Sequence, residues 1–387
     1  MGAEVSASLV VVEGAGASLL GRDLMAALGL QVQVVDQLSN SGSLKHRLDQ
    51  LLEKHWQVFS EELGRCIGPD VSILVDKSVD ARFLPARKVP YAWADKLEKE
   101  LQRLQGDGII EPVCHSEWAS PTVPVLKEDG TLRICGDYKQ TVNKACRVDI
   151  YHLLKVEDMF AQLAGGQTFS KIDLRQAYAQ LPLAEERRKY TTINTPHGLY
   201  QYTRLPFGVS SAPAIFQRRI ENILAGIPRT LVRVDDILVT GLTDEEHLQN
   251  LGEVLDRLEQ AGLRAKLPKC KFMAESVIYN GHQVDKEGIQ PTEEKMEAVL
   301  EAHQPQNKAE LRSYLGLINY YGRFIANLSS ILTPLNDLLK KRAVWGWEAR
   351  EADAFQESKE ALKAADLVVH YDPKLDLVVK GDASPQY

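Results

Sequence analysis

The sequence has no apolar run of membrane-spanning length, no secretory signal and no paired cysteines. Its longest apolar stretches fall short of the roughly 18 residues that a transmembrane helix needs, and the N-terminus lacks the basic start of a signal peptide. The cysteines are odd in number, scattered and without a C-x-x-C pair, which is typical of free thiols in a reducing compartment rather than of a zinc site or a disulfide framework. We therefore expect an intracellular protein, cytoplasmic or nuclear, without a membrane partner. The five cysteines are Cys66, Cys114, Cys135, Cys146 and Cys270.

An excess of basic residues is also missing. The chain has 46 Lys and Arg against 53 Asp and Glu, a formal net charge of −7. Because phosphate binding normally uses a basic surface, this balance argues weakly against a nucleic-acid partner, although a local basic groove can exist on an acidic protein. The length of 387 residues is enough for two or three domains of ordinary globular composition.

The stretch TLVRVDDILVTG places Asp235 and Asp236 side by side in a run of apolar, mostly β-branched residues. On a regular strand their side chains would point to opposite faces, so at least one carboxylate would enter the core without a partner. A strand, tight turn and strand would instead put both carboxylates at the tip, where a divalent cation would offset their repulsion. The alternative is a hairpin turn in solvent, since Asp is common in turns.

A third acid, Asp173, interrupts an earlier strand-like run, TFSKIDLRQAYAQLPL. Three carboxylates on two adjacent strands would form a site for two divalent ions, which can hold the attacking and leaving oxygens of a phosphoryl displacement. Magnesium suits such a site because it needs only one or two protein carboxylates per ion and takes its other ligands from phosphates and water. Taken alone, Asp173 is explained equally well as a strand-end acid facing solvent.

Helices are predicted where apolar spacing agrees with a cap or a stop. The clearest pattern is TDEEHLQNLGEVLDRLEQAGL, in which Thr243 and Glu246 form a capping box and Gly262 ends the helix. In another, Asn307 is the cap and Glu310 follows three residues later. Together with similar patterns, these signals predict further helices at about residues 45–59, 96–105, 293–302, 308–326 and 350–365.

Two more local signals are a hairpin and a capped helix. In TVPVLKEDGTLRICGDYK the EDG triplet predicts a turn between two strands, with basic residues at the rim. In RLPFGVSSAPAIFQRRI the serines predict a helix start, with Ser210 or Ser211 as cap and Pro213 in the first turn. Both signals are also compatible with ordinary surface structure.

Several motifs follow one another in a fixed order: SEWASPTVPVLKEDGTLRICGDYK, FSKIDLRQAY, GLYQYTRLPFGVSSAPAIFQRRIENIL, VDDILV and KCKFMAESVIYNGHQVDKEGI. From about Arg82 onward this series resembles the reverse transcriptase of gypsy-type LTR retrotransposon Pol polyproteins. One Asp pair would be a weak signal, whereas the series is a specific one. The resemblance implies an α+β, right-hand polymerase with fingers, a palm whose antiparallel sheet carries helices on one face, and a helical thumb.

The resemblance also implies roles for single residues. Asp173, Asp235 and Asp236 match the catalytic triad of the palm, which binds two Mg²⁺ ions. Lys127 and Arg133 match the pair on the fingers hairpin that holds the triphosphate of the incoming nucleotide. Their chemistry fits, because ammonium and guanidinium groups are common phosphate ligands, but a solvated basic hairpin is the alternative.

Further matches concern the sugar and the primer. Tyr178 matches the aromatic gate that excludes a 2′-hydroxyl, and would otherwise be a core residue. Phe207 and Gly208 match the turn that packs near the nucleotide and template. The hairpin that holds the primer matches the segment containing Tyr279, Gly281 and His282.

The sequence departs from the family pattern at three places. Arg233 stands two residues before the Asp pair, where the family usually has an aromatic residue beside the primer end. Tyr279-Asn280-Gly281-His282 replaces the usual Tyr-Leu-Gly-His. Tyr151-His152-Leu153-Leu154 replaces the usual Tyr-Pro-Leu-Pro.

The ends of the chain suggest neighbouring domains. LLGRDLMAALGL resembles the C-terminus of a retroviral-type aspartic protease, and GDAS, with Asp382, resembles the first catalytic strand of an RNase H domain. Neither activity is expected, because no Asp-Thr-Gly or Asp-Ser-Gly triplet precedes the first segment and one acid is not an RNase H site. The predicted division is a protease remnant (1–36), a linker at QLSNSGS with an N-terminal helix (37–80), fingers and palm (81–290), thumb and connection helices (291–349) and the start of an RNase H-like domain (350–387).

The sequence thus predicts an RNA-directed DNA polymerase, part of a Pol polyprotein. Its partners would be an RNA or DNA template with a primer, and deoxynucleoside triphosphates. The alternative is a degenerate, catalytically inactive retroelement remnant that at most binds nucleic acid, since the departures are also what a decaying genomic copy would show. Whether the chain forms a homodimer is left open.

Overall fold

The computed structural model describes residues 38–127, 130–147, 162–325, 327–341, 343–364 and 368–369. The proposed protease remnant, the Tyr151–Leu154 motif and Asp382 lie outside these ranges. All five cysteines lie inside them and are free thiols, as predicted. Among the helices of the described ranges, none is both long and apolar enough to cross a membrane.

The chain divides into two compact units, residues 1–52 and 53–387. The described part of the first unit belongs to helix α2 (Leu38–Lys54), whose residues from Glu53 onward are counted in the second unit. The prediction of a linker at Gln37–Ser43 is therefore wrong from Leu38 onward, where the chain is helical. Helix propensity is a weak guide for Ser, Asn and Gly, because each costs less than about 1 kcal/mol in a helix.

A four-stranded antiparallel sheet, here called the central sheet, has the order β7-β8-β4-β9. In β4 and β8 the register places Asp173 opposite Asp236, and Val234 and Asp235 form the turn between β7 and β8. This confirms the predicted strand, turn and strand around the Asp pair. The strands are β4 (Phe169–Asp173), β7 (Thr230–Arg233), β8 (Asp236–Thr240) and β9 (Lys271–Ala274).

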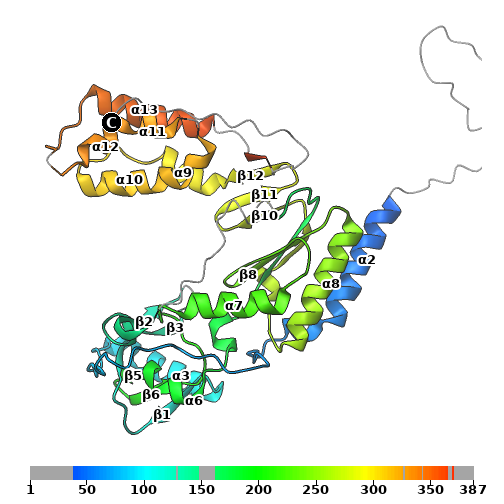
Figure 1. The fold of residues 1–387 in the computed structure, drawn as a ribbon, viewed down its shortest axis with the longest axis vertical. Helices are drawn as coiled ribbons and strands as arrows, with labels where there is room; N and C mark the ends of the chain where they lie inside the picture. Colours follow the sequence, from blue (N-terminus) through cyan, green and yellow to red (C-terminus); the bar gives the residue numbers. More distant parts are fainter. Residues whose placement is uncertain are drawn as a thin grey trace, which may run out of the picture. The chain divides into compact units, whose positions relative to one another are not determined.

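Helices α7 (Ala212–Leu224) and α8 (Asp244–Gln260) pack against β7 and β8 respectively, and against each other (Figure 1). The predicted cap of α8 is confirmed, because the Thr243 side chain accepts a hydrogen bond from the Glu246 backbone N–H. At the start of α7, Ser211 holds the N-cap position and its hydroxyl lies 3.2 Å from the Cys146 thiol, which donates to it.

A five-stranded sheet has the order β1-β6-β5-β2-β3. In the sequence, β1 to β3 precede β4, and β5 and β6 lie between β4 and α7. Its β2–β3 hairpin confirms the strands predicted on either side of the EDG turn, with Val125 opposite Arg133. Helix α3 (Tyr91–Gly106) packs against it through Leu97, Leu101 and Leu104. The strands are β1 (Ile110–Val113), β2 (Ser120–Leu126), β3 (Leu132–Gly136), β5 (Ile193–Thr195) and β6 (Gly198–Tyr202).

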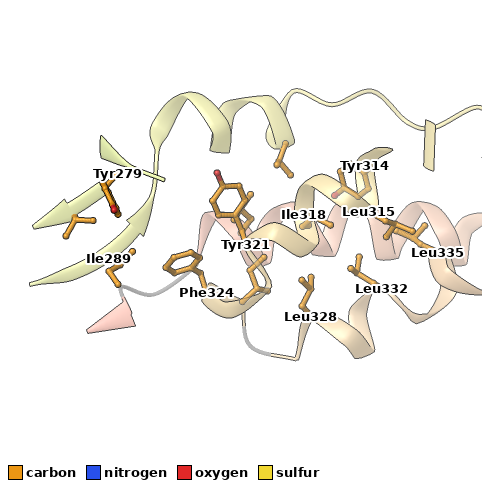
Figure 2. Packing of buried hydrophobic residues seen from close by; sticks show 14 of the residues in the cluster. Tyr279, Ile289, Tyr314, Leu315, Ile318, Tyr321, Phe324, Leu328, Leu332 and Leu335 are labelled. Carbon is orange, nitrogen blue, oxygen red and sulfur yellow. The ribbon is translucent and has the colours of Figure 1, made fainter. Parts of the chain in front are cut away.

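A third sheet, β10-β11-β12-β13, adjoins a helical region, and together they share one large apolar cluster (Figure 2). We call this the C-terminal cluster; its buried members include Tyr279, Ile289, Ile318, Tyr321 and Phe324. The elements are β10 (Ser276–Tyr279), β11 (His282–Asp285), β12 (Gly288–Pro291), β13 (Val368–Val369), α9 (Glu293–Leu300), α10 (Lys308–Tyr320), α11 (Leu328–Ile331), α12 (Thr333–Leu338) and α13 (Ala349–Lys363).

The predicted helices of this region are confirmed, with shorter ends. Helix α10 begins as predicted, with the Asn307 side chain accepting from the N–H groups of Ala309 and Glu310. Helix α13, which the sequence assigns to an RNase H-like segment, contributes Phe355 to the C-terminal cluster. The remaining short elements are α4 (Val142–Ala145), α6 (Glu185–Arg188) and 3-10 turns at Trp56–Phe59, Tyr138–Gln140, Ala177–Gln180, Lys189–Thr191, Leu267–Lys269 and Gly322–Phe324.

Candidate active site

The turn that carries Asp235 is held in an unusual conformation. Val234 has φ of +52°, which is costly for a β-branched residue because its side chain crowds the backbone. Gln217 of α7 is buried and bonds to both flanks of the turn: its Nε2 donates to the Val232 carbonyl at 2.7 Å, and its Oε1 accepts from the Val234 N–H at 2.7 Å. No pattern in the sequence indicates this contact. The two bonds fix the backbone immediately before the Asp pair.

The three predicted acids come together at this turn. Asp173 and Asp236 are directly opposite each other on antiparallel strands, so their side chains share one face of the sheet. Burial raises the pKa of both carboxyls, and the nearby charge of Asp235 raises each further. The site is therefore a concentration of negative charge that is partly removed from water.

Two lysines lie against these carboxylates. The Lys171 Nζ is 3.0 Å from Asp236 Oδ2, and the Lys269 Nζ is 3.7 Å from Asp173 Oδ2. Sequence reasoning missed both, although Lys171 precedes Asp173 by two residues and must share its face of β4. Both lysines lower the pKa of the carboxyl that they face, against the effect of burial.

The carboxylates alone do not form a complete metal cage. Within the described ranges, no group of three or more His, Cys, Asp and Glu side chains is placed to hold a metal ion. The donor set nevertheless fits Mg²⁺, which takes one or two protein carboxylates per ion and completes its shell with water and substrate phosphates. Asp173, Asp235 and Asp236 are the residues that would hold it.

A cavity of about 470 Å³ opens beside the acids. Its lining combines Asp173 and Asp235 with three residues predicted for the nucleotide, Lys127, Arg133 and Phe207. Four further basic side chains, which the sequence analysis did not single out, also line it: Arg175, Lys266, Lys269 and Arg103. The chain is acidic overall, so this local positive charge is what a polyphosphate would meet.

A group of three aromatic rings reaches the cavity through Phe207. The Tyr178 ring centroid lies 4.6 Å from that of Phe207 and 5.4 Å from that of Phe216. Phe207 also contacts Arg133, whose guanidinium carbon lies over the ring at 4.3 Å from its centre. Burial, with a smaller effect of Asp235, raises the pKa of Tyr178 to about 12, so its hydroxyl stays neutral. Arg133, predicted to bind phosphate, and Tyr178, predicted to exclude a 2′-hydroxyl, are thus linked through their shared contact with Phe207.

The loop that carries Phe207 is fixed by its neighbours. Gly208 has φ of +94°, and a Cβ there would lie 3.1 Å from the Gly136 carbonyl oxygen, so the position favours glycine. Asn143 of α4 bonds to this loop twice: its Nδ2 donates to the Gly208 carbonyl at 2.8 Å, and its Oδ1 accepts from the Ser210 N–H at 2.8 Å. Asn143 is a second positioning residue that the sequence analysis missed.

The predicted primer-holding residues lie in the β10–β11 hairpin. The side chains of Tyr279 and His282 are fully buried, so they support the hairpin from within. A primer would therefore contact the turn between them. In that turn Asn280 has φ of +48° and Gly281 +74°, typical of a tight two-residue hairpin. The Tyr320 hydroxyl of α10 donates to the Asn280 carbonyl at 2.6 Å. This bond ties helix α10 to the turn of the hairpin.

Arg233 is half-buried at the end of β7, directly opposite Asp236 in the register. Its charge also reaches the β10–β11 hairpin, since it lowers the pKa of Tyr279 while burial, the larger effect, raises it. A cation therefore stands next to the acids at a position where the sequence comparison expected an aromatic ring.

Comparisons with known proteins show which families and folds this chain resembles. Residues 125–284 match the family model "Reverse transcriptase (RNA-dependent DNA polymerase)". The chain is 35% identical over 297 residues to the uncharacterized protein K02A2.6 of Caenorhabditis elegans, covering 76% of this chain and 23% of that protein. It is 34% identical to the Transposon Tf2-3 polyprotein of Schizosaccharomyces pombe, covering 69% and 20%. The chain thus spans about a fifth to a quarter of the length of these relatives.

Solved structures of a foamy viral protease-reverse transcriptase are also similar. One, in complex with double-stranded DNA, has a TM-score of 0.79 at 25% identity and covers 86% of this chain and 59% of that one. Another, in complex with an RNA/DNA hybrid, has a TM-score of 0.75 at 25% identity and covers 86% and 45%. These matches confirm the predicted α+β polymerase fold.

Proposed function

We propose that this chain, whose residues 125–284 carry a reverse transcriptase domain, is an RNA-directed DNA polymerase that works as part of a retrotransposon Pol polyprotein. It would extend a primer on an RNA or DNA template, with deoxynucleoside triphosphates as substrates. The observation that carries the proposal is the placement of Asp173 opposite Asp236, with Asp235 in the adjoining turn, beside a cavity lined by basic side chains. The similar viral structures hold double-stranded DNA and an RNA/DNA hybrid, which supports the same classes of partner here.

In this proposal the three carboxylates hold two Mg²⁺ ions, which when bound would stabilise charge on the transferred phosphoryl group. The primer 3′-hydroxyl attacks the α-phosphate of the nucleotide, and pyrophosphate leaves. Lys127 and Arg133 hold the triphosphate, because both line the cavity beside the acids and their positive charges complement the negative phosphates. Fixed positive groups at the phosphates favour the transition state if they need no rearrangement during the reaction.

Tyr178 would exclude ribonucleotides. Its ring is held between Phe207 and Phe216, so it cannot move aside easily for a 2′-hydroxyl. Discrimination by a rigid ring acts through steric clash rather than through attraction to the correct substrate. The contact between Arg133 and Phe207 would keep this wall in place while the same arginine reaches the phosphates.

Arg233 favours a second candidate, a degenerate chain that binds nucleic acid without polymerising. Its charge opposite Asp236 would oppose a divalent cation at the same strand end. Such a chain would retain the basic cavity and the fold, and so would still bind template and primer.

Primer extension decides between the two candidates. Purified protein is mixed with a DNA primer on an RNA template, deoxynucleotides and Mg²⁺, and binding of the primer–template is measured in parallel. The first proposal predicts extension that EDTA abolishes. Tight binding without extension over a wide range of Mg²⁺ concentrations would favour the inactive remnant.

A further inference from the structure

We infer that Lys171 is a resident counter-ion of the carboxylate site: it competes with a divalent cation for Asp236 and thereby sets the metal concentration that the protein needs. The inference rests on the proposed function, since it assumes that Asp236 belongs to a metal site. It concerns the state before nucleotide binds, in which a protein cation must balance the acids.

The position of Lys171 follows from strand geometry. Residues two apart on a strand share a face, so Lys171 lies on the same side of β4 as Asp173. Its partner in the register is Leu238 of β8, which makes Asp236 its diagonal neighbour, within reach of a long side chain. The resulting ion pair of 3.0 Å is sheltered, with side chains only 21% and 25% exposed.

The pair differs from the other lysine contact at the site. Lys269 is 3.7 Å from Asp173, and its side chain is 58% exposed, so water screens it. Of the two lysines, Lys171 is the closer to its carboxylate and the less exposed to water, which makes it the stronger counter-ion of the acids.

A metal ion and this ammonium need the same oxygens. A cation that binds Asp236 must displace Lys171 from Oδ2 or share the carboxylate with it, and in both cases two positive charges come close in a partly dry site. Without the ammonium that repulsion is gone, while Asp173, Asp235 and Asp236 all remain. Loss of the lysine charge should therefore strengthen metal binding, which is the opposite of what loss of a ligand would do.

The test measures metal binding without nucleotide or activity. Free Mn²⁺ is titrated by electron paramagnetic resonance at pH 8 for the full chain and for Lys171→Met, with Lys171→Gln as a second variant that keeps a hydrogen-bond donor but no charge. We expect the Mn²⁺ dissociation constant to fall by about tenfold in both. Lys269→Met should give a smaller decrease, and Lys99→Met, an exposed lysine on α3, none.

Thermal unfolding gives a second readout. Lys171→Met should unfold at a lower temperature than the parent in EDTA, because the acids lose their counter-ion, and should gain more from added Mg²⁺. An unchanged or weaker Mn²⁺ affinity in the two Lys171 variants would overturn the inference while leaving the polymerase proposal intact. If the parent binds no more Mn²⁺ than Asp235→Asn does, the metal site itself fails, and the inference with it.

Discussion

The acidic end of the central sheet and the C-terminal cluster are built by opposite means. At the acidic end, Asp173, Asp236 and Lys171 are half-buried, Asp235 and Lys269 are exposed, and Val234 takes a strained backbone angle. In the C-terminal cluster, tyrosines and aliphatic side chains such as Tyr321 and Ile318 are fully buried (Figure 2), and helices α10 and α13 carry side-chain caps. In the cluster, local conformational preference and core packing favour the same structure, whereas the site includes a strained backbone angle and partly buried charges. The difference indicates that one region stabilises the fold, and it fits the proposal that the other performs chemistry at some cost in stability.

The hairpin β10–β11 combines features of both regions. Its buried residues Tyr279 and His282 belong to the apolar side, and the His282 ring lies 5.2 Å from that of Tyr320. Its turn, by contrast, is where the family resemblance expects a primer. The comparison therefore predicts that changes in the cluster act on stability, and that changes near the acids act on catalysis.

The largest effect on stability is expected for Ile318→Ala. This side chain is fully buried in the C-terminal cluster, and its truncation leaves a cavity that should cost about 2–5 kcal/mol of unfolding free energy. Urea denaturation measures the loss, with the exposed residue of the same helix, Arg312→Ala, as the control. Equal losses in the two variants would contradict the role given to the cluster.

The next effect is expected for Gln217→Leu, which removes both bonds to the turn at Val234. Each buried group left without a partner costs about 1–3 kcal/mol, and the strained turn should relax and move Asp235. We expect the maximal rate of extension to fall by roughly 10- to 100-fold while the KM for nucleotide changes little. Gln217→Glu keeps the acceptor for the Val234 N–H and should recover part of the rate. A loss confined to KM would argue against a positioning role.

A smaller effect, on selectivity, is expected for Tyr178→Ala. Removal of the ring opens the space beside the sugar, so the ratio of ribonucleotide to deoxynucleotide incorporation should rise by roughly tenfold or more. The control is Phe216→Leu, which alters the packing behind the ring but leaves the ring in place. If the ratio is the same in Tyr178→Ala and the parent, the residue only fills the core.

The smallest effect is expected for Arg233→Tyr. Replacing the guanidinium opposite Asp236 by a neutral ring removes a charge that opposes metal binding, so extension should become faster and need less Mg²⁺. Since Arg233 is partly exposed, screening should limit the change in half-maximal Mg²⁺ concentration to about tenfold. A variant that is no faster and needs as much Mg²⁺ as the parent would show that Arg233 does not weaken the site.

Local signals in the sequence predicted the parts of the structure that depend on neighbours in the chain. The Thr243 and Asn307 caps, the hairpin around Val125 and Arg133, and the strand–turn–strand at the Asp pair all follow from spacing or turn chemistry. These features need no knowledge of distant contacts.

The contacts that the sequence did not predict join segments far apart in the chain. Gln217 reaches the turn at Val234, and Asn143 reaches the loop at Gly208, only once helices and strands are placed. The pair of Lys171 with Asp236 also requires the register of β4 and β8, because a shift by one residue would turn the lysine to the other face. The position of the acids was therefore predictable from the sequence. The side chains that fix the nearby backbone and the lysine that pairs with Asp236 were not.

The most direct test of the account is Asp235→Asn. This change removes a carboxylate from the site but leaves a side chain of the same shape on an exposed turn. With primer extension on RNA, primer–template binding and thermal unfolding measured on one preparation, we predict that extension falls by orders of magnitude while binding and melting temperature stay those of the parent. Extension at the parental rate would contradict the assignment of the active site.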